Sequence, residues 1–123
     1  MTDEMRQTLD EIIKVAEDNG WRVDTNEQSN GDIELTFYQY SPAGQDFSFY
    51  ITLDKDDNIR DCAQAVYEYY EAYEPEAETM LWLDSEGHGK NGAPYHMKDL
   101  LEDMEACEKM LEDLSIALEN YKM

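Results

Sequence analysis

Three segments between residues 21 and 53 alternate apolar with polar residues, which is typical of strands that bury one face and expose the other. A two-residue turn at residues 30–31 would place Val23 on the wrong face, whereas three-residue loops at 29–31 and 42–44 keep the apolar residues together. Both loops end in glycine, which tolerates the positive φ of their third position. The sequence therefore predicts a three-stranded antiparallel meander. The expected pairs are Val23 with Phe37, Phe37 with Phe49, Leu35 with Ile51, and Ile33 with Leu53.

Apolar residues recur at helical spacing on both sides of these strands. We expect a first helix over residues 2–19, with Gly20 in the left-handed conformation that often ends a helix. A second helix is expected to begin after Asp57 or Asn58, whose side chains can cap it. Pro75 then breaks or kinks this helix because proline lacks the backbone N–H that a helix interior requires.

The last third of the chain predicts further helices. Residues 76–84 are interpreted as a short helix, with a buried strand as the alternative. Pro94 suits the first turn of a long final helix. Apolar residues of this final helix recur in steps of three and four, which makes an unbroken heptad seam. The seam consists of Met97, Leu100, Met104, Cys107, Leu111, Leu114, Leu118 and Tyr121.

Together these elements predict an α+β fold in a single domain over residues 1–123. We expect an N-terminal helix, the three-stranded meander, and then two or three helices packed on one face of the sheet. Cys62 and Cys107 fall on apolar helical faces, where a free thiol behaves as a small hydrophobic group. The predicted core consists of Leu9, Ile12, Ile13, Ala16, Trp21, Val23, Ile33, Leu35, Phe37, Phe47, Phe49, Ile51, Leu53, Val66, Trp82, Leu100, Met104, Leu111, Leu114 and Leu118.

The composition is strongly acidic, with 30 Asp and Glu against 9 Lys and Arg and a formal net charge of -21. Binding to nucleic acid or to an anionic membrane needs clustered cations, so this balance argues against both. No apolar run reaches the ~20 residues of a membrane span, and the polar, acidic start fits neither a signal peptide nor a transit peptide. With two isolated cysteines, we expect a cytoplasmic location without a disulfide.

Few residues suggest metal binding or catalysis. Residues 54–58 carry oxygen ligands at alternate positions, but Ile59 and Ala65 stand where a calcium loop needs Gly and Glu. His88 and His96 have no second ligand at a useful spacing. We therefore expect no metal, no cofactor, no catalytic residue and no enzymatic activity. A carboxylate pair acting on a neutral substrate is the one chemistry that the composition leaves open.

The stretch between Arg60 and Lys90 contains no basic residue but many carboxylates. Four of them recur at helical steps, about 5–6 Å apart, which resembles the spacing of phosphates along one DNA strand. Such a carboxylate row attracts the basic groove of a DNA-binding protein, although a solvated face that keeps the chain soluble is the simpler interpretation. The carboxylate row consists of Glu68, Glu71, Glu74 and Glu78.

Tyrosine is the second unusual feature. Tyr38, Tyr40 and Tyr50 fall on the sheet face opposite the predicted core. Tyrosine offers a large contact area at low entropic cost and is enriched in interfaces. A mixed surface of tyrosines and carboxylates is therefore a candidate site for a basic protein partner, with cross-strand pairing as the structural alternative.

Several motifs also carry a resemblance. They are Tyr40-Ser41-Pro42-Ala43-Gly44-Gln45-Asp46-Phe47, Met80-Leu81-Trp82-Leu83, Gly89, Asn91-Gly92-Ala93-Pro94, Leu100-Leu101-Glu102-Asp103 and Met110-Leu111-Glu112-Asp113-Leu114. Over roughly residues 33–118, the chain resembles small acidic proteins of gut-bacterial conjugative elements and phages, a group without established enzymatic activity. The resemblance implies a mobile-element context, in which small acidic proteins antagonise host defence or regulate transfer.

Two functions are expected on these grounds. The first is a non-enzymatic, acidic protein-binding module of a mobile element, of the DNA-mimic type, that inhibits a basic nucleic-acid-handling protein. The alternative is an assembly module in which the long final helix, from Met97 to Tyr121, pairs with a partner helix or with a second copy as a homodimer.

Overall fold

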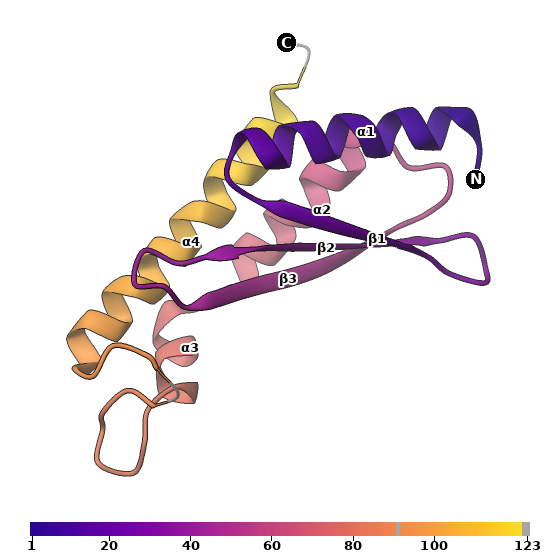
Figure 1. Ribbon diagram of the computed structural model, residues 1–123. Helices are drawn as coiled ribbons and strands as arrows, with labels where there is room; N and C mark the ends of the chain where they lie inside the picture. The colour runs from indigo at the N-terminus through magenta and orange to yellow at the C-terminus, as the bar shows by residue number, and fades with distance from the viewer. Residues whose placement is uncertain (91, 122–123) are drawn as a thin grey trace.

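The computed structural model describes residues 1–90 and 92–121 (Figure 1). Asn91, part of the Asn-Gly-Ala-Pro motif, and residues 122–123 lie outside the described residues. In chain order the elements are α1 (Asp3–Asp18), β1 (Arg22–Glu27), β2 (Ile33–Tyr40), β3 (Asp46–Leu53), α2 (Ile59–Ala72), α3 (Pro75–Leu81) and α4 (Met97–Glu119).

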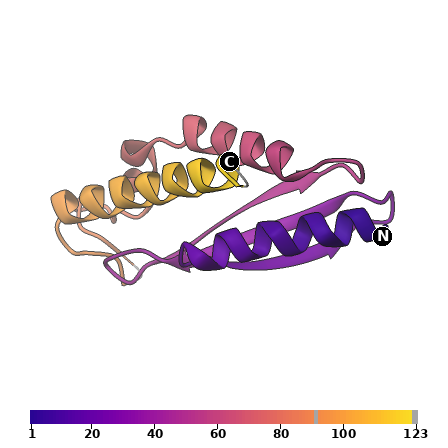
Figure 2. The ribbon, with the colours of Figure 1, turned by 90° about the horizontal axis from the view of Figure 1, so that it is seen from above.

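The helices form a layer over one face of an antiparallel sheet with the strand order β1-β2-β3 (Figure 2). α2 and α4 pack side by side, α1 lies along β1 and also contacts both of these helices, and α3 packs against α4. This arrangement confirms the predicted α+β fold, with an N-terminal helix, a meander and then helices on one sheet face.

The register of the sheet is the predicted one. Both hairpin loops contain three residues, and Gly31 and Gly44 at their third positions have φ of 92° and 87°. The Ser41 N–H donates to the Gln45 carbonyl at 2.8 Å and closes the second loop. The observed pairs are Val23 with Phe37, Phe37 with Phe49, Leu35 with Ile51, and Ile33 with Leu53. The apolar residues of the three strands therefore share the face that the helices cover.

Local side-chain chemistry sets the helix ends. Asn58 and Asp61 form a capping box at the start of α2, in which each side chain accepts a hydrogen bond from the other residue's backbone N–H. Pro75 is the first residue of α3, a position at which its missing N–H costs nothing. Gly20 follows α1 with φ of 87°, as predicted. The short-helix interpretation of residues 76–84 is confirmed over Pro75–Leu81.

The final helix begins later than predicted. α4 starts at Met97 with His96 as its N-cap, so Pro94 precedes the helix and is not in its first turn. Backbone bonding in the preceding loop explains the difference, because the Gly89 N–H donates to the Tyr95 carbonyl at 2.9 Å. This hydrogen bond holds the chain after Pro94 against the loop, and the helix begins only beyond it.

The core lies between the sheet and the helices, and Trp21 is its largest fully buried side chain. Its ring centroid lies 5.5 Å from that of Phe49 and 6.5 Å from that of Phe37, both nearly edge to face. Most of the predicted core residues are buried.

The prediction for Trp82 was wrong: this side chain is only half-buried, because Trp82 is the C-cap of α3, which packs mainly on α4. Ile13 is also half-buried, and Val15 takes the buried position on α1. Val23 and Phe47 are half-buried and pack against the edge of the core.

A buried carboxylate joins the β2–β3 loop to α4. Asp103 is only 5% exposed, and its Oδ2 accepts a hydrogen bond from the Ser41 hydroxyl at 2.6 Å. Its Oδ1 accepts from the Ala43 N–H at 2.9 Å. Gln45 extends the connection by donating from Nε2 to the Gly92 carbonyl at 2.8 Å. Asp103 thus holds the end of the sheet against the helical layer.

We expect Asp103→Ala to lower the free energy of unfolding by about 1.5–3 kcal/mol, because it leaves the Ser41 hydroxyl and the Ala43 N–H without their charged acceptor. Urea denaturation measures this difference. Glu102→Ala is the matched control, since this exposed neighbour on α4 should change stability by no more than about 0.5 kcal/mol. Equal stability of the two variants would contradict a structural role for Asp103.

Candidate functional site

The carboxylate row does not lie on one helix. Glu68 and Glu71 are exposed on α2, whereas Glu74 lies after the end of α2 and is the N-cap of α3, immediately before Pro75. Glu78 is on α3, half-buried beside a cavity. The structure therefore divides the predicted row between two helices and turns its last member inward.

The packing of α3 on α4 brings four other carboxylates together. An open depression of about 390 Å³ lies between the two helices, and Tyr73 contributes to its lining. The acidic residues around it are Glu74, Glu76, Glu105 and Glu108, and we call this surface the acidic depression. Sequence reasoning found Glu74 but missed the members on α4. The signal for them was the recurrence of acids at 102, 105, 108 and 112 between the seam positions.

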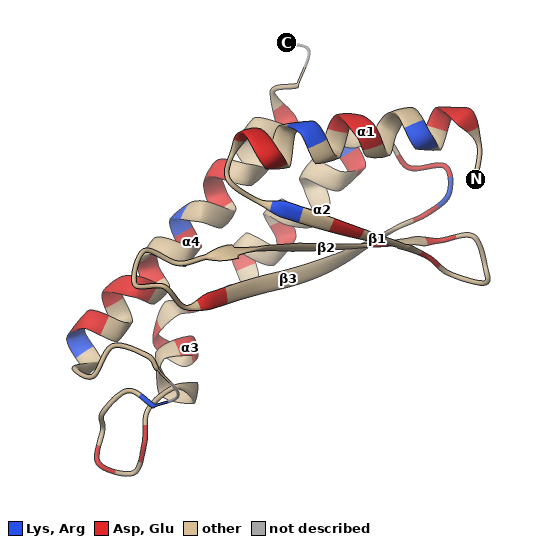
Figure 3. Cartoon of the chain, in the orientation of Figure 1, with Lys and Arg blue, Asp and Glu red and all other residues tan. Residues whose placement is uncertain are grey.

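Basic residues do not neutralise the acidic depression. Among the described residues, no ion pair reaches its four carboxylates. Lys109, the nearest cation along α4, pairs with Glu112 at 3.1 Å and with Asp113 at 2.9 Å. Figure 3 shows acidic residues on all four helices, with few basic residues among them.

Tyr70 links α2 to α4 beside this surface. Its hydroxyl donates to Glu112 Oε2 at 2.9 Å, which raises the pKa of Tyr70. Lys109 and Tyr70 both donate hydrogen bonds to Glu112 and lower the pKa of its carboxyl, and the effect of Lys109 is the larger. Glu112 is therefore ionised at neutral pH, and its carboxylate is already engaged by Lys109 and Tyr70 of the same chain.

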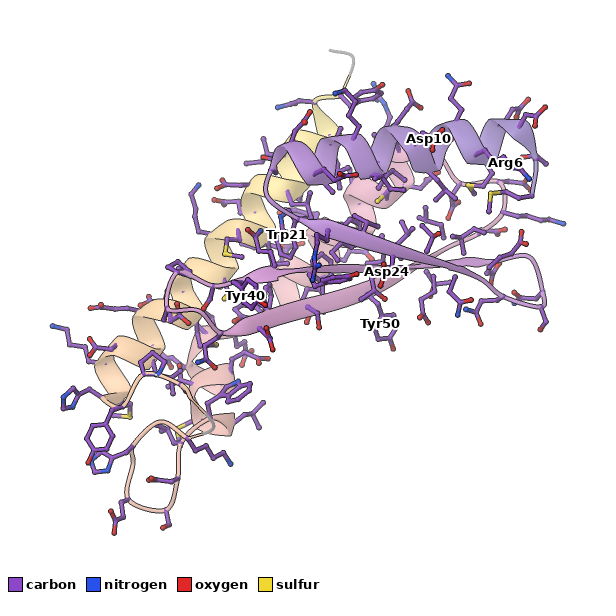
Figure 4. All side chains as sticks on the ribbon, in the orientation of Figure 1. Arg6, Asp10, Trp21, Asp24, Tyr40 and Tyr50 are labelled. Carbon is purple, nitrogen blue, oxygen red and sulfur yellow. The ribbon has the colours of Figure 1, made fainter. Side chains whose placement is uncertain are left out.

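The predicted tyrosine face exists, but it is a separate surface. Tyr40 and Tyr50 are 68% and 64% exposed on the sheet face that the helices leave open (Figure 4). Tyr38 lies between them, with the Arg22 guanidinium 4.6 Å from its ring centroid. A hydrogen bond with Asp24 raises the pKa of Tyr38. A shallow groove of about 810 Å³ runs past Tyr38 and Tyr40. The structure does not join these tyrosines to Glu68 and Glu71, which lie in the helical layer.

The histidines lie outside the core, whereas the cysteines are buried within it. His88 stacks on Tyr95 with ring centroids 4.1 Å apart, and His96 caps α4 without a side-chain hydrogen bond to it. Cys62 and Cys107 are buried free thiols, and burial raises the pKa of each to about 12. Such thiols are neutral and unreactive at neutral pH. Within residues 1–90 and 92–121, no cluster of His, Cys, Asp or Glu is arranged to hold a metal ion.

The heptad seam of α4 packs within the monomer. Its central members, from Leu100 to Leu118, are buried in the fold, whereas Met97 is exposed. A second helix would have to open the core to reach this seam. The homodimer through the final helix therefore stays a prediction that the packing of the monomer does not favour.

No family model matches the chain, and neither the search of curated proteins nor the search of solved structures returns a match. None of the helices in the described part of the chain is both long and apolar enough to cross a membrane. The fold and the site define a small, strongly acidic α+β domain whose helical layer carries the acidic depression and whose open sheet face carries three tyrosines.

Proposed function

We propose that the protein is a non-enzymatic binding module that inhibits a basic, nucleic-acid-handling protein by presenting carboxylates in place of DNA phosphates. The observation that carries the proposal is the acidic depression. The packing of α3 on α4 brings four carboxylates together there, and none of them pairs with a cation among the described residues. The resemblance to proteins of conjugative elements and phages fits an inhibitor of this kind in a cytoplasmic setting.

The charge of the whole chain supports the same proposal. A net charge of -21 on 123 residues creates a field that steers a basic partner toward the protein and accelerates association. The same field repels nucleic acid, so the partner and not the DNA is the expected ligand. Because the acidic depression is concave and lined partly by Tyr73, it offers local shape as well as charge.

The expected result of a binding experiment is a salt-sensitive complex that duplex DNA displaces. The immobilised protein should retain a basic host protein at about 0.1 M salt and release it near 1 M, as the Debye length falls from ~10 Å to ~3 Å. Neutralising the acidic depression should weaken this complex about fourfold or more, since four ion pairs near the surface contribute about 0.2–1 kcal/mol each. The test variant carries Glu74→Gln, Glu76→Gln, Glu105→Gln and Glu108→Gln.

A control variant with the same net charge as the test variant distinguishes binding at the acidic depression from a general effect of the protein's charge. It carries Glu4→Gln, Asp10→Asn, Glu17→Gln and Asp56→Asn, all at exposed positions outside the acidic depression. Titration calorimetry with the purified partner should give this control nearly the affinity of the unaltered protein. Equal weakening in both variants would remove the acidic depression from the mechanism, and a complex that DNA does not displace would contradict DNA mimicry.

A further inference from the structure

A second cavity lies where the beginning of β3 meets α2, α3 and α4. Its volume is about 240 Å³. Since one water takes ~30 Å³ of liquid, this space holds about eight waters or the end of one side chain. Its lining includes four aromatic residues and two acidic residues: Phe47, Tyr69, Tyr73, Trp82, Asp46 and Glu78.

The aromatic rings around this cavity are held in place by the fold. Tyr69 stacks on Phe49 with ring centroids 4.8 Å apart. Tyr73 meets Phe47 edge to face, at 5.8 Å and 76°, and its hydroxyl donates to Met104 Sδ at 3.5 Å. Rings that are fixed before a ligand arrives lose little entropy on binding.

Glu78 supplies a negative charge to these aromatic walls. Its side chain is half-buried, and no hydrogen bond or ion pair engages its carboxylate within the described part of the chain. Burial is the main cause of the raised pKa of Tyr69 and of Tyr73, and the charge of Glu78 raises both further. Glu78, Tyr69 and Tyr73 line the same cavity, so the carboxylate faces a group that lies between the rings.

We propose that this cavity binds the ammonium group of a lysine side chain of the partner. The identity of this ligand rests on the proposed function, which supplies the basic partner. Aromatic faces attract a cation through the ring quadrupole, and more strongly where water is partly excluded. Glu78 accepts a charge-assisted hydrogen bond from the same ammonium. This combination deepens the binding mode, because it anchors one basic side chain in a defined pocket beside the acidic depression.

The geometry favours lysine over arginine. A guanidinium is planar, and it binds best when it stacks on a parallel ring and forms a bidentate pair with a carboxylate. The rings of Phe47 and Tyr73 stand at 76° to each other, so these two rings do not form parallel walls for a guanidinium. A compact ammonium contacts rings at any angle, and its aliphatic stem packs against the apolar edges.

Short blocked Gly/Ser peptides with one central lysine, acetyl-lysine or arginine test the proposal by NMR. Trp82 serves as the probe because it lines the cavity, and Trp21 serves as the reference because it is 2% exposed in the core and lies outside the lining, although its ring contacts Phe47 with centroids 5.9 Å apart. We expect the lysine peptide to shift the Trp82 indole N–H with a Kd in the millimolar range and to shift that of Trp21 much less, because Trp21 reaches the cavity only through its contact with Phe47. The acetyl-lysine peptide should produce no shift, and the arginine peptide should bind more weakly.

Glu78→Gln keeps the shape of the cavity and should weaken binding of the lysine peptide about tenfold. Glu17→Gln changes the net charge equally on α1 and should have no effect. Equal shifts with the acetyl-lysine peptide, or unaltered affinity in Glu78→Gln, would overturn the proposal. Tighter binding of the arginine peptide would overturn the assignment to lysine.

The outcomes also separate this inference from the proposed function. If the lysine peptide leaves Trp82 unshifted while the partner complex still depends on the acidic depression, the cavity inference fails and the proposed function stands. If neutralising the acidic depression leaves the partner complex unchanged while the lysine peptide shifts Trp82, the proposed function fails and the cavity remains a lysine site.

Discussion

Leu118→Glu should lower the free energy of unfolding by at least about 4 kcal/mol, which is a large part of the stability of a small domain. Leu118 is 0% exposed in the core, and the substitution both removes its packing and buries a carboxylate without a partner. Urea denaturation followed by far-UV circular dichroism measures the loss, and light scattering measures the oligomeric mass.

Ile116→Glu is the matched control on the same turn of α4. Ile116 is 47% exposed, so this variant should lose less than about 1 kcal/mol. If the unaltered protein were a dimer that Leu118→Glu converted into a stable monomer, the seam would be an interface and the assembly function would replace the proposed one.

Trp21→Ala should cost about 3–5 kcal/mol, because it removes the largest fully buried side chain and leaves a cavity in the core. The loss includes edge-to-face contacts with Phe37 and Phe49, which add to the area that the indole buries.

The other tryptophan provides the comparison. Trp82 is half-buried at the end of α3, so Trp82→Ala should cost at least about 2 kcal/mol less than Trp21→Ala. Chemical denaturation of both variants distinguishes them. Similar losses would mean that α3 belongs to the main cooperative core, contrary to its position beside α4.

The elements and the sheet register were predictable because their causes are local. Alternation with a period of two marks the strands, and each hairpin loop has a glycine where φ must be positive, as Gly31 and Gly44 show. The break between α2 and α3 was predictable for the same reason, since Pro75 lacks a backbone N–H. Local rules failed at Pro94. A hydrogen bond from the Gly89 N–H to the Tyr95 carbonyl holds the chain in the loop, so the helix begins only at Met97.

The candidate site was only partly predictable. Glu74 belongs both to the predicted carboxylate row and to the acidic depression, but Glu105 and Glu108 join it only because α3 packs against α4. No short window of sequence contains both helices. In the same way, Trp82 has apolar neighbours in the chain and Trp21 lies between Gly20 and Arg22, yet packing makes Trp21 central and Trp82 peripheral.

The sequence by itself determined the strands, their register, the approximate helices and the acidic character of the protein, because these follow from periodicity, turn chemistry and composition. The tertiary structure alone decided that the seam of α4 is buried within the chain, that Glu78 turns toward a cavity, and that the acidic depression forms. These features depend on which surfaces of distant segments meet. The free energy of that choice comes from apolar area buried between elements, which no local pattern of residues encodes.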